Sequence, residues 1–518
     1  MPSPNNVENQ IIDSQIVNRE VDVKGKTNIK SAGVGVFMCM ITLVGTRLGA
    51  GVVGVPYATQ QVGFPLAFSF EIAYPITAIF TLYLLLKVRE MTGETSLTNI
   101  GYYWYGRIAI FFFNGLIALG QLAYAVIFFI VFGDVAGGLI EKVNTSGISF
   151  WSSRWFTHTI LAVIMLYMVM KKEIHQLKYA GFALLTLILI FITLFLVHYL
   201  TSQNNPSSQS HFVKENIGVK TFAFLPTFAT SYSIHPSFFT AFLAMKNKTT
   251  INGLKTAILA QVVFFWVYIS TPLISFGLYG TGVKSNMLKS VASEDGVISV
   301  VLLVIFLWIA VIHIPLIFFF GKEWILIVFD EAVRRSYSKN KVTIEAKSTT
   351  EIKNNDEQPA DIENAQNNNQ QPSQENQDLP VLEEIVVANQ ERPQHNVGEA
   401  DFNENEERNN SKTPHPKEYL NMKPLYYYII TITWFVLVVL LSIVVGDVSV
   451  FFGIIGATLA WFQVLVAPGS FYIITVHRKK ISFTDTKSII LYILSWIVST
   501  IGVAWMIGFC TCVILFNF

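Results

Sequence analysis

Long apolar segments recur along almost the whole of this 518-residue chain, and they constrain its fold more than any other feature. A helix needs about 20 apolar residues to cross the roughly 30 Å of hydrocarbon in a bilayer. With 52% hydrophobic and 14% charged residues, the composition excludes a soluble protein of this length. The sequence therefore predicts an all-α membrane protein with about 11 transmembrane helices. The predicted spans are 33–58, 65–87, 108–132, 156–170 (the shortest), 179–200, 217–245, 254–280, 297–320, 425–446, 451–476 and 488–515.

Positive charge orients these spans, because Lys and Arg accumulate in cytoplasmic connections. With the N-terminus in the cytoplasm, the inner connections hold most of the basic residues. The outer connections then hold only Lys142, Arg154, Lys214, Lys220, Lys284 and Lys289. We therefore expect a cytoplasmic N-terminus and a C-terminus on the outer or lumenal side. The sequon at Asn144 falls in an outer loop and is a glycosylation candidate. The plasma membrane and a vacuolar or endosomal membrane both fit this topology.

Two polar regions interrupt the apolar pattern. Residues 1–32 form a polar N-terminus that we expect in the cytoplasm, and residues 339–422 separate transmembrane residues 33–338 from transmembrane residues 423–518. The second region is acidic and rich in Asn and Gln. Such a composition cannot bury enough apolar surface to offset the entropy of ordering the chain. We predict a disordered cytoplasmic insertion, and the sequence identifies no partner for its residues 340–420.

Two predicted spans depart from a simple membrane helix. The run from Val44 to Pro56, VGTRLGAGVVGVP, contains four Gly, an Arg and a terminal Pro, all of which weaken a mid-membrane helix. The run from Pro226 to Pro236, PTFATSYSIHP, is rich in hydroxyl groups. Close helix packing would account for the first run alone, and a proline kink would account for the second. Non-helical backbone at membrane depth is otherwise tolerated where it lines a cavity.

The two runs are better explained together. They lie in the first and sixth spans, and interrupted helices at matching positions of two halves are typical of an inverted-repeat transporter. Spans one to five and six to ten would form the repeats, with the eleventh outside them. Free amides and carbonyls at the breaks then predict a mid-membrane site for a zwitterion. The expected substrate-binding residues are Thr46, Arg47, Gly49, Ala50, Gly51, Thr230, Ser231, Tyr232 and Ser233.

Short motifs in register along the chain resemble those of one family. The run GAGVVGVPYA, residues 49–58, is similar to the first-span signature of the amino acid/auxin permease family, a branch of the amino acid–polyamine–organocation superfamily. Four further strings resemble later family motifs: GETSL at 93–97, SIHP at 233–236, IPLIFFFGKE at 314–323, and FGIIGAT at 452–458 with Pro468. The resemblance covers nearly the whole chain outside the N-terminus and the insertion. It implies a LeuT-like fold of 11 spans with a 5+5 inverted repeat, and secondary transport of amino acids driven by Na⁺ or H⁺.

This chain departs from the Na⁺-coupled branch of that family at two positions. The first span of that branch carries an Asn-Ser pair where this chain has Gly45 and Thr46, and the eighth span carries a hydroxyl residue where this chain has His313. Both positions are thought to ligate Na⁺ in that branch. Gly45 offers no side-chain oxygen, and imidazole suits a hard cation poorly. We therefore expect coupling to H⁺, or no coupling, in place of coupling to Na⁺.

Arg47 lies next to these positions, at a depth where a charged side chain costs roughly 2.5–3.5 kcal/mol. Three roles are open for it. The guanidinium can be a fixed cation that takes over the role of Na⁺. It can bind a substrate carboxylate through two parallel donors. It can also form a structural pair with Glu71, the acidic side chain well inside the second span. The pair does not exclude the other two roles.

His235 and His313 fall in the sixth and eighth spans, which form the expected site. Imidazole titrates near neutral pH, so either residue could carry a coupling proton. His313 is the favoured candidate because it replaces a cation ligand, and a neutral His bonded to a freed carbonyl is the structural alternative. The sequence contains no metal-ligand cluster, phosphate loop or nucleophile–base arrangement. It therefore predicts no cofactor, no metal, no enzymatic activity and no nucleic-acid partner.

These observations predict a secondary active transporter that moves small neutral amino acids by alternating access. A second hypothesis belongs to another class: an amino-acid sensor, or transceptor, that signals through its cytoplasmic parts. The long acidic insertion is the feature that favours a sensor. An ion channel is a weaker hypothesis, because a channel needs a continuous polar path and only two interrupted spans point to one.

Overall fold

The structure is a computed structural model that describes residues 33–143, 150–172, 177–202, 218–340, 418–481 and 485–517. It divides into a helical unit, residues 1–333 with 422–518, and a second unit, residues 334–421. Of the second unit, the described parts are residues 334–340 and 418–421, where Arg334 donates a hydrogen bond to the Asn421 carbonyl oxygen at 3.0 Å. The predicted N-terminal region, most of the predicted insertion and the sequon at Asn144 lie outside the described residues.

The described residues from 33 to 202 contain seven helices. Most begin at a polar cap or end at a glycine: Ser96 caps α4, Ser153 caps α6, and Gly63, with φ +88°, separates α2 from α3. These devices satisfy or terminate the backbone hydrogen bonds that a helix end leaves open. The helices are α1 (Val36–Arg47), α2 (Ala50–Val62), α3 (Phe64–Thr92), α4 (Leu97–Tyr105), α5 (Ile108–Val143), α6 (Arg154–Met170) and α7 (Leu177–Thr201).

The second part of the unit begins with three short helices, where the sequence predicts one span over 217–245. Pro226 starts the second of them, and Pro236 lies at the start of the third, because proline cannot continue a preceding helix. The helices are α8 (Val219–Phe224), α9 (Pro226–Tyr232), α10 (His235–Leu243), α11 (Thr250–Tyr279), α12 (Met287–Ala292), α13 (Val297–Val333), α16 (Pro424–Val445), α17 (Val448–Ile455), α18 (Ala467–Arg478) and α19 (Thr486–Asn517). Two π-helical turns, Gly456–Ala460 and Phe462–Val466, join α17 to α18.

The described residues contain eight helices that are long and apolar enough to cross a membrane. A ninth span results if α1 and α2, which meet at a bend of 63°, are counted as one. The apolar helix α6 is shorter, and α8 to α10 are broken. Helix is therefore present at every predicted span, whereas the number of spans is established only as eight or nine by length and composition. The prediction of a multi-pass helical membrane protein is confirmed.

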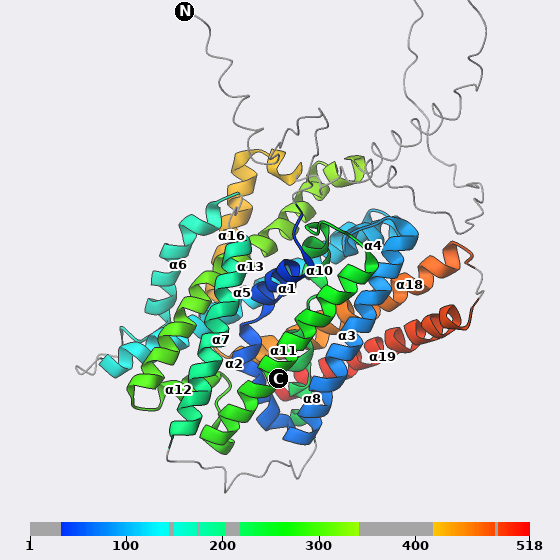
Figure 1. The fold of residues 1–518 in the computed structure, drawn as a ribbon. Helices are drawn as coiled ribbons and strands as arrows, with labels where there is room; N and C mark the ends of the chain where they lie inside the picture. Colours follow the sequence, from blue (N-terminus) through cyan, green and yellow to red (C-terminus); the bar gives the residue numbers. More distant parts are fainter. Residues whose placement is uncertain are drawn as a thin grey trace, which may run out of the picture. The chain divides into compact units, whose positions relative to one another are not determined.

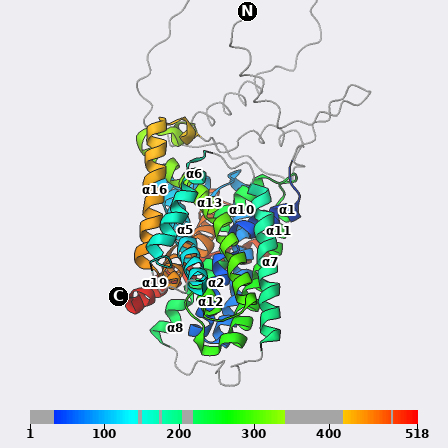
Figure 2. The same cartoon turned by 90° about the vertical axis from the view of Figure 1, so that its left-hand side faces the viewer.

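The helices pack into one bundle around α5 and α13, which make the most extensive contact between any two helices described. Most residues of α1 and α2 are buried, and the two helices lie near the middle of the view in Figure 1. Helices α16 and α7 lie on opposite sides of the bundle in Figure 2. Helix α19 runs along α18 and the π-helical turns. Many apolar side chains on the outer helices are exposed, as expected for surfaces that face lipid. The central helices are thus the ones that can enclose a polar site.

The two interrupted regions are tied together at one end. The amide of Val34, before α1, donates to the Ala244 carbonyl oxygen at 2.9 Å, and the Lys246 amide donates to the Val34 carbonyl oxygen at 3.0 Å. The added Cβ of a side chain at Gly33 would lie 2.4 Å from the Lys246 Cα atom, so the backbones are in direct contact. The start of α1 and the end of α10 are therefore held side by side.

Candidate functional site

The break in the first span lies at Leu48 and Gly49. The Leu48 amide ends α1 by donating to the Val44 carbonyl oxygen at 2.7 Å, and α2 begins at Ala50. Glycine is required at position 49 by close contacts: an added Cβ would lie 2.9 Å from Phe128 of α5 and 3.0 Å from His313 of α13. The first turn of α2 therefore presents backbone amide groups at the centre of the bundle, where a helix N-terminus favours an anion.

The break in the sixth predicted span separates α9 from α10 at Ser233 and Ile234. Two carbonyl oxygens near this break are bonded by side chains from other helices. The Tyr124 hydroxyl of α5 donates to the Thr230 carbonyl oxygen at 2.7 Å, and the Gln261 amide of α11 donates to the Tyr232 carbonyl oxygen at 3.1 Å. A freed carbonyl in an apolar interior is costly unless it is paired, so these two side chains stabilise the break.

The structure brings the two predicted halves of the site together. A Cβ added at Gly51 would lie 2.8 Å from the Ser231 hydroxyl and 2.7 Å from the ring of Tyr268. Gly51 is therefore the point where α2 contacts α9. Every predicted substrate-binding residue except Arg47 is buried: Thr46, Gly49, Ala50, Gly51, Thr230, Ser231, Tyr232 and Ser233. Their proximity agrees with a single site.

Three hydroxyl groups of the predicted site, those of Thr46, Thr230 and Ser231, donate to backbone carbonyls. Thr46 donates to the Thr42 carbonyl oxygen at 2.8 Å, and Ser231 donates to the Thr227 carbonyl oxygen at 2.9 Å. Thr230 lies within 3.2 Å of the Phe452 carbonyl oxygen in α17. Hydroxyls bonded in this way stabilise the helices that lead into the breaks. A ligand at the breaks would thus meet mainly backbone groups.

Arg47 is half-buried at the last position of α1, and its guanidinium contacts neutral groups. Its Nε and Nη2 atoms donate to the Ser237 hydroxyl oxygen at 2.9 and 2.6 Å. The side-chain oxygen of Gln121 accepts from Nη2 at 2.9 Å when the amide is oriented to pair donor with acceptor. The guanidinium also lies 5.7 Å from the centre of the Tyr124 ring. The positive charge of Arg47 is therefore stabilised by the dipoles of neutral side chains at the edge of the site.

A cavity of about 10 Å³ lies beside this guanidinium, close to the smallest volume that holds one water molecule. Such a volume cannot hold an amino acid, so this cavity is too small to be an open substrate site. Its polar wall contains Arg47, Gln121, Tyr124, Ser233 and Gln463, and its apolar wall contains Ile117, Gly120, Pro236, Ile455, Leu459 and Ala460. The walls come from α1, α5, the break between α9 and α10, and the region from α17 to the π-helical turns.

The positions matched to the Na⁺ ligands of related transporters also lie close together. The His313 ring is fully buried, stacks on Phe128 with a centroid distance of 4.6 Å, and lies near the carbonyl of Gly45. A Cβ added at Gly45 would lie 2.1 Å from the carbonyl oxygen of Gly181, so this glycine permits α1 to contact α7. Gly45 thus has a packing role that its sequence position did not reveal.

The structure places His235 of α10 against α3, and Glu71 of α3 near α9. The Nε2 atom of His235 forms a hydrogen bond with the Thr81 hydroxyl at 2.9 Å, which links α10 to α3. The structure does not bring Arg47 and Glu71 together: among the described residues no ion pair joins them, and Glu71 lies near Tyr232. Arg47 instead points toward α5 and Ser237, so the predicted structural pair is absent from this conformation.

Several contacts to the breaks were not predicted from sequence. Gln121, Ser237, Gln261 and Tyr268 all contact the predicted site residues directly. Gln121 and Gln261 lie inside otherwise apolar spans, and a polar side chain in such a place has to find a partner. The presence of a single polar side chain in an apolar span was therefore the sequence feature that could have identified Gln121 and Gln261. Periodicity could not identify which face of each helix meets the breaks.

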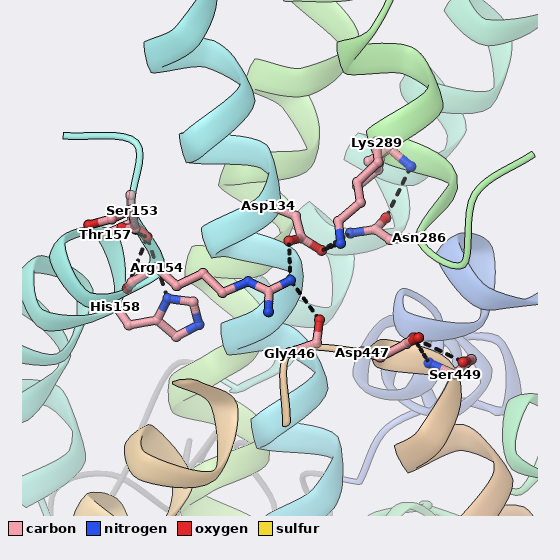
Figure 3. A network of polar contacts seen from close by, with 11 residues as sticks. Asp134, Ser153, Arg154, Thr157, His158, Asn286, Lys289, Gly446, Asp447 and Ser449 are labelled. Atoms are coloured by element: carbon pink, nitrogen blue, oxygen red, sulfur yellow. Dashed lines mark hydrogen bonds and ion pairs between the residues drawn. The ribbon is translucent and has the colours of Figure 1, made fainter. Parts of the chain in front are cut away.

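A network of charged groups joins four segments near one end of the bundle. Asp134 of α5, with a side chain only 4% exposed, contacts Arg154 of α6 at 3.2 Å and Lys289 of α12 at 3.2 Å. It also accepts a hydrogen bond from Asn286 at 2.8 Å, and Arg154 donates to the Gly446 carbonyl oxygen at 2.7 Å. Figure 3 shows Asp134 between Arg154 on one side and Asn286 and Lys289 on the other. One carboxylate thus holds α12 against α5 and α6.

Replacing Asp134 by Asn should destabilise the closed bundle by about 1–3 kcal/mol, because two cations lose their shared anion and Asp134 is buried while they are one-third exposed. Thermal unfolding in detergent measures the effect. Glu90→Gln is the control, since Glu90 pairs with Lys87 at an exposed position and should change stability by no more than about 0.5 kcal/mol. Equal melting temperatures for Asp134→Asn and the wild type would contradict the structural role of the network.

The chain is similar in sequence to several proteins that are named as amino acid transporters. The chain is 23% identical to mouse "Sodium-coupled neutral amino acid transporter 7" over 289 residues, which covers 54% of this chain and 62% of that protein. It is 21% identical to "Vacuolar amino acid transporter 5" of Schizosaccharomyces pombe, over 54% of this chain and 68% of that protein. It is 26% identical to "Amino acid transporter AVT1J" of Arabidopsis thaliana, over 48% of this chain and 57% of that protein. The match thus spans less than two thirds of the mouse and Arabidopsis relatives.

The family comparison covers much more of the chain. The model of a family described as "Transmembrane amino acid transporter protein" matches residues 32–515, which include both breaks and every described membrane helix except the last residues of α19. The predicted resemblance to amino acid/auxin permeases is thereby confirmed. The chain belongs to the transmembrane amino acid transporter family, whose members are membrane transporters and not enzymes.

Proposed function

We propose that this protein is a secondary active transporter of small neutral amino acids that works by alternating access. The observation that carries this proposal is the contact between two interrupted helices at Gly51 and Ser231, in the centre of a membrane bundle. The amides that open α2 can receive a substrate carboxylate, and carbonyls at the end of α9 can receive its ammonium group. These two groups are common to all amino acids.

The closed conformation supports alternating access. The cavity beside Arg47 is too small for an amino acid, so substrate entry needs a separation of the helices around it. Ile117, Ile455 and Leu459 supply the apolar part of the wall, which favours an uncharged side chain. Arg47 can bind the carboxylate or act as a fixed cation, because its present partners are neutral and can be exchanged.

The position of the breaks supports the full topology of 11 spans. With α1 and α2 as the first span, α6 as the fourth and α8 to α10 as the sixth, the breaks fall in the first span of each half of five. This placement favours a LeuT-like 5+5 inverted repeat, with α19 as the eleventh span. The distribution of basic residues then favours a cytoplasmic N-terminus, and the membrane is a plasma membrane or a vacuolar or endosomal one.

The site favours coupling to H⁺, or no coupling, over coupling to Na⁺. Gly45 brings no side-chain oxygen and packs against Gly181, and the imidazole of His313 stands where the Na⁺-coupled branch has a hydroxyl. Arg47 adds a permanent positive charge nearby. A Na⁺ ion prefers several hard oxygen ligands and is repelled by such a charge.

The test is uptake of radiolabelled neutral amino acids into proteoliposomes under an imposed pH gradient or an imposed Na⁺ gradient. We expect uptake that a Na⁺ gradient does not stimulate. The His313→Ala variant, measured in parallel, asks whether this imidazole contributes to pH-driven uptake, and a loss is expected if His313 carries the proton. Uptake that requires a Na⁺ gradient would contradict the proposed ion preference. Absence of uptake and of exchange would contradict the transporter.

A further inference from the structure

A cluster of buried polar groups lies next to the proposed substrate site and includes a carboxyl. Glu71 and Tyr74 share one face of α3, Tyr232 ends α9, Tyr268 belongs to α11, and Trp461 lies between the two π-helical turns. The ring centroids of Tyr74 and Tyr232 are 6.1 Å apart, and those of Tyr232 and Tyr268 are 5.1 Å apart. All five side chains are at most 3% exposed.

Five buried polar atoms of this cluster lack hydrogen-bond partners in the described structure. They are Oε1 of Glu71, the hydroxyl oxygens of Tyr74, Tyr232 and Tyr268, and Nε1 of Trp461. Buried polar atoms are nearly always bonded, and exceptions mark strain, a functional group, or space for water or an ion. Here one acceptor and four donors, none of them satisfied, gather in the same buried region. Packing alone does not explain such a concentration.

No basic side chain of the described residues neutralises Glu71. Among the titratable groups of the helices packed around it, the ones that face the cluster are Tyr74, Tyr232 and Tyr268. Tyr124 of α5 also lies close enough to interact electrostatically with Tyr74 and Tyr268. Other titratable residues of α3, α11 and α18 lie farther along these helices, toward their ends. They are Lys87, Arg89, Tyr83, Lys255, Tyr279, His477 and Arg478. His235 is bonded to Thr81, ten residues along α3 and thus about 15 Å away, and Arg47 is bonded to Ser237.

We propose that Glu71 is the proton-binding residue of the transport cycle. An unpaired carboxylate is costly in an apolar interior, and a bound proton removes its charge. Glu71 takes up one H⁺ from water when the bundle opens on one side, remains a neutral carboxylic acid in the closed state, and releases the H⁺ when the bundle opens on the other side. This inference rests on the proposed transport function and names the group that couples it to H⁺.

The cluster has direct contacts with both breaks, through which protonation can act on the substrate site. Tyr232 is the last residue of α9, and its carbonyl is held by Gln261. Tyr268 contacts Gly51, at the start of α2, where a Cβ would lie 2.7 Å from its ring. A change in the charge of Glu71 can therefore be transmitted through Tyr232 and Tyr268 to the backbone that we assign to substrate binding. His313, on the other side of the break, belongs to a separate contact with Phe128.

The experiment uses the full chain in proteoliposomes loaded with a fluorescent pH indicator. It records substrate-induced proton flux and, without any ion gradient, exchange of labelled for unlabelled amino acid. We expect Glu71→Gln, which mimics the protonated carboxyl, to keep exchange and to lose substrate-induced proton flux. Glu90→Gln makes the same change at an exposed site of the same helix and should keep proton flux. His313→Gln tests the other candidate: loss of proton flux in His313→Gln while Glu71→Gln retains it would assign the proton to His313 and overturn the inference.

Each remaining outcome is decisive. Proton flux that persists in Glu71→Gln, or that is absent from the wild type while exchange is normal, overturns the inference and leaves the transporter standing. Absence of exchange in the wild type overturns the transport function itself. If Glu71→Gln does not fold, Glu71→Asp decides, because it keeps a carboxyl at a changed position. Its proton flux should persist with a shifted pH profile, and a profile identical to that of the wild type would overturn the proposal.

Discussion

The Arg47→Met variant should lose amino acid uptake by about ten- to 100-fold, because charge-assisted hydrogen bonds contribute about 1.5–3 kcal/mol and this guanidinium supplies the only positive charge that lines the described cavity. Met retains the length and apolar stem of the side chain. The substitution therefore removes the charge with little change in volume. Initial rates of uptake into proteoliposomes, at saturating and limiting substrate, measure the loss.

The Arg47→Lys variant separates charge from geometry. A guanidinium offers parallel donors in a planar fork, whereas an ammonium is a point charge. If Arg47 binds the substrate carboxylate, Lys should raise KM and retain part of the maximal rate. If Arg47 acts only as a fixed cation, Lys should restore transport almost completely. Wild-type uptake in Arg47→Met would show that neither role is correct and that Arg47 contributes only its contact with Ser237.

The Gly45→Ala variant should destabilise the protein by about 1–3 kcal/mol and abolish transport, because the new methyl group overfills the contact between α1 and α7. It would lie 2.1 Å from the Gly181 carbonyl oxygen and 2.5 Å from the Gly181 Cα atom. Both are backbone atoms, so relief requires the helices to separate. Separation would move the adjoining break at Gly49 away from His313. Melting temperature in detergent and uptake measure the two effects.

The matched control is Gly115→Ala in α5. An added Cβ at Gly115 has no heavy atom within 4 Å, so the substitution should show only the gain in helix propensity, up to about 1 kcal/mol. The two identical substitutions are therefore expected to change stability in opposite directions. A stable, active Gly45→Ala protein would mean that α1 and α7 are not in contact in the functional molecule.

Hydropathy predicted where the long helices lie, because membrane spanning requires length and apolarity that are visible in sequence. The predicted span 65–87 corresponds to α3, and 254–280 corresponds to α11. Helix α13 continues beyond the predicted span 297–320 to Val333, where its polar end includes the buried Glu331 paired with Arg107. Hydropathy cannot detect a helix that continues past the apolar region.

Local chemistry predicted the breaks but not their detailed shape. Gly and Pro indicated that the first and sixth spans are interrupted, and the structure has ends of helices at Arg47 and Tyr232. The π-helical turn that begins at Gly456 was not foreseen. At this turn the chain lies against the Pro226 backbone, whose carbonyl oxygen a Cβ at Gly456 would approach to 2.0 Å. Such a contact is tertiary and leaves no periodic signal.

In the candidate site, too, some features could be predicted from sequence and others could not. The two backbone segments of the site could be predicted from sequence, because residues that disfavour a continuous helix, such as Gly and Pro, are concentrated in them. Partners of individual side chains could not, because sequence does not give the rotation of one helix relative to another. Arg47 and Glu71 illustrate this: opposite charges at comparable depth suggested a pair, whereas Arg47 contacts Ser237 and Glu71 faces Tyr232.

The most direct test of a sodium-independent site at the two breaks is counterflow in sodium-free medium. Proteoliposomes are loaded with an unlabelled neutral amino acid, diluted into choline buffer containing the labelled form, and given no ion gradient. We predict transient accumulation of label in the wild type, its loss in Arg47→Met, and no stimulation when Na⁺ replaces choline. Counterflow that appears only with Na⁺ would contradict this account of the site.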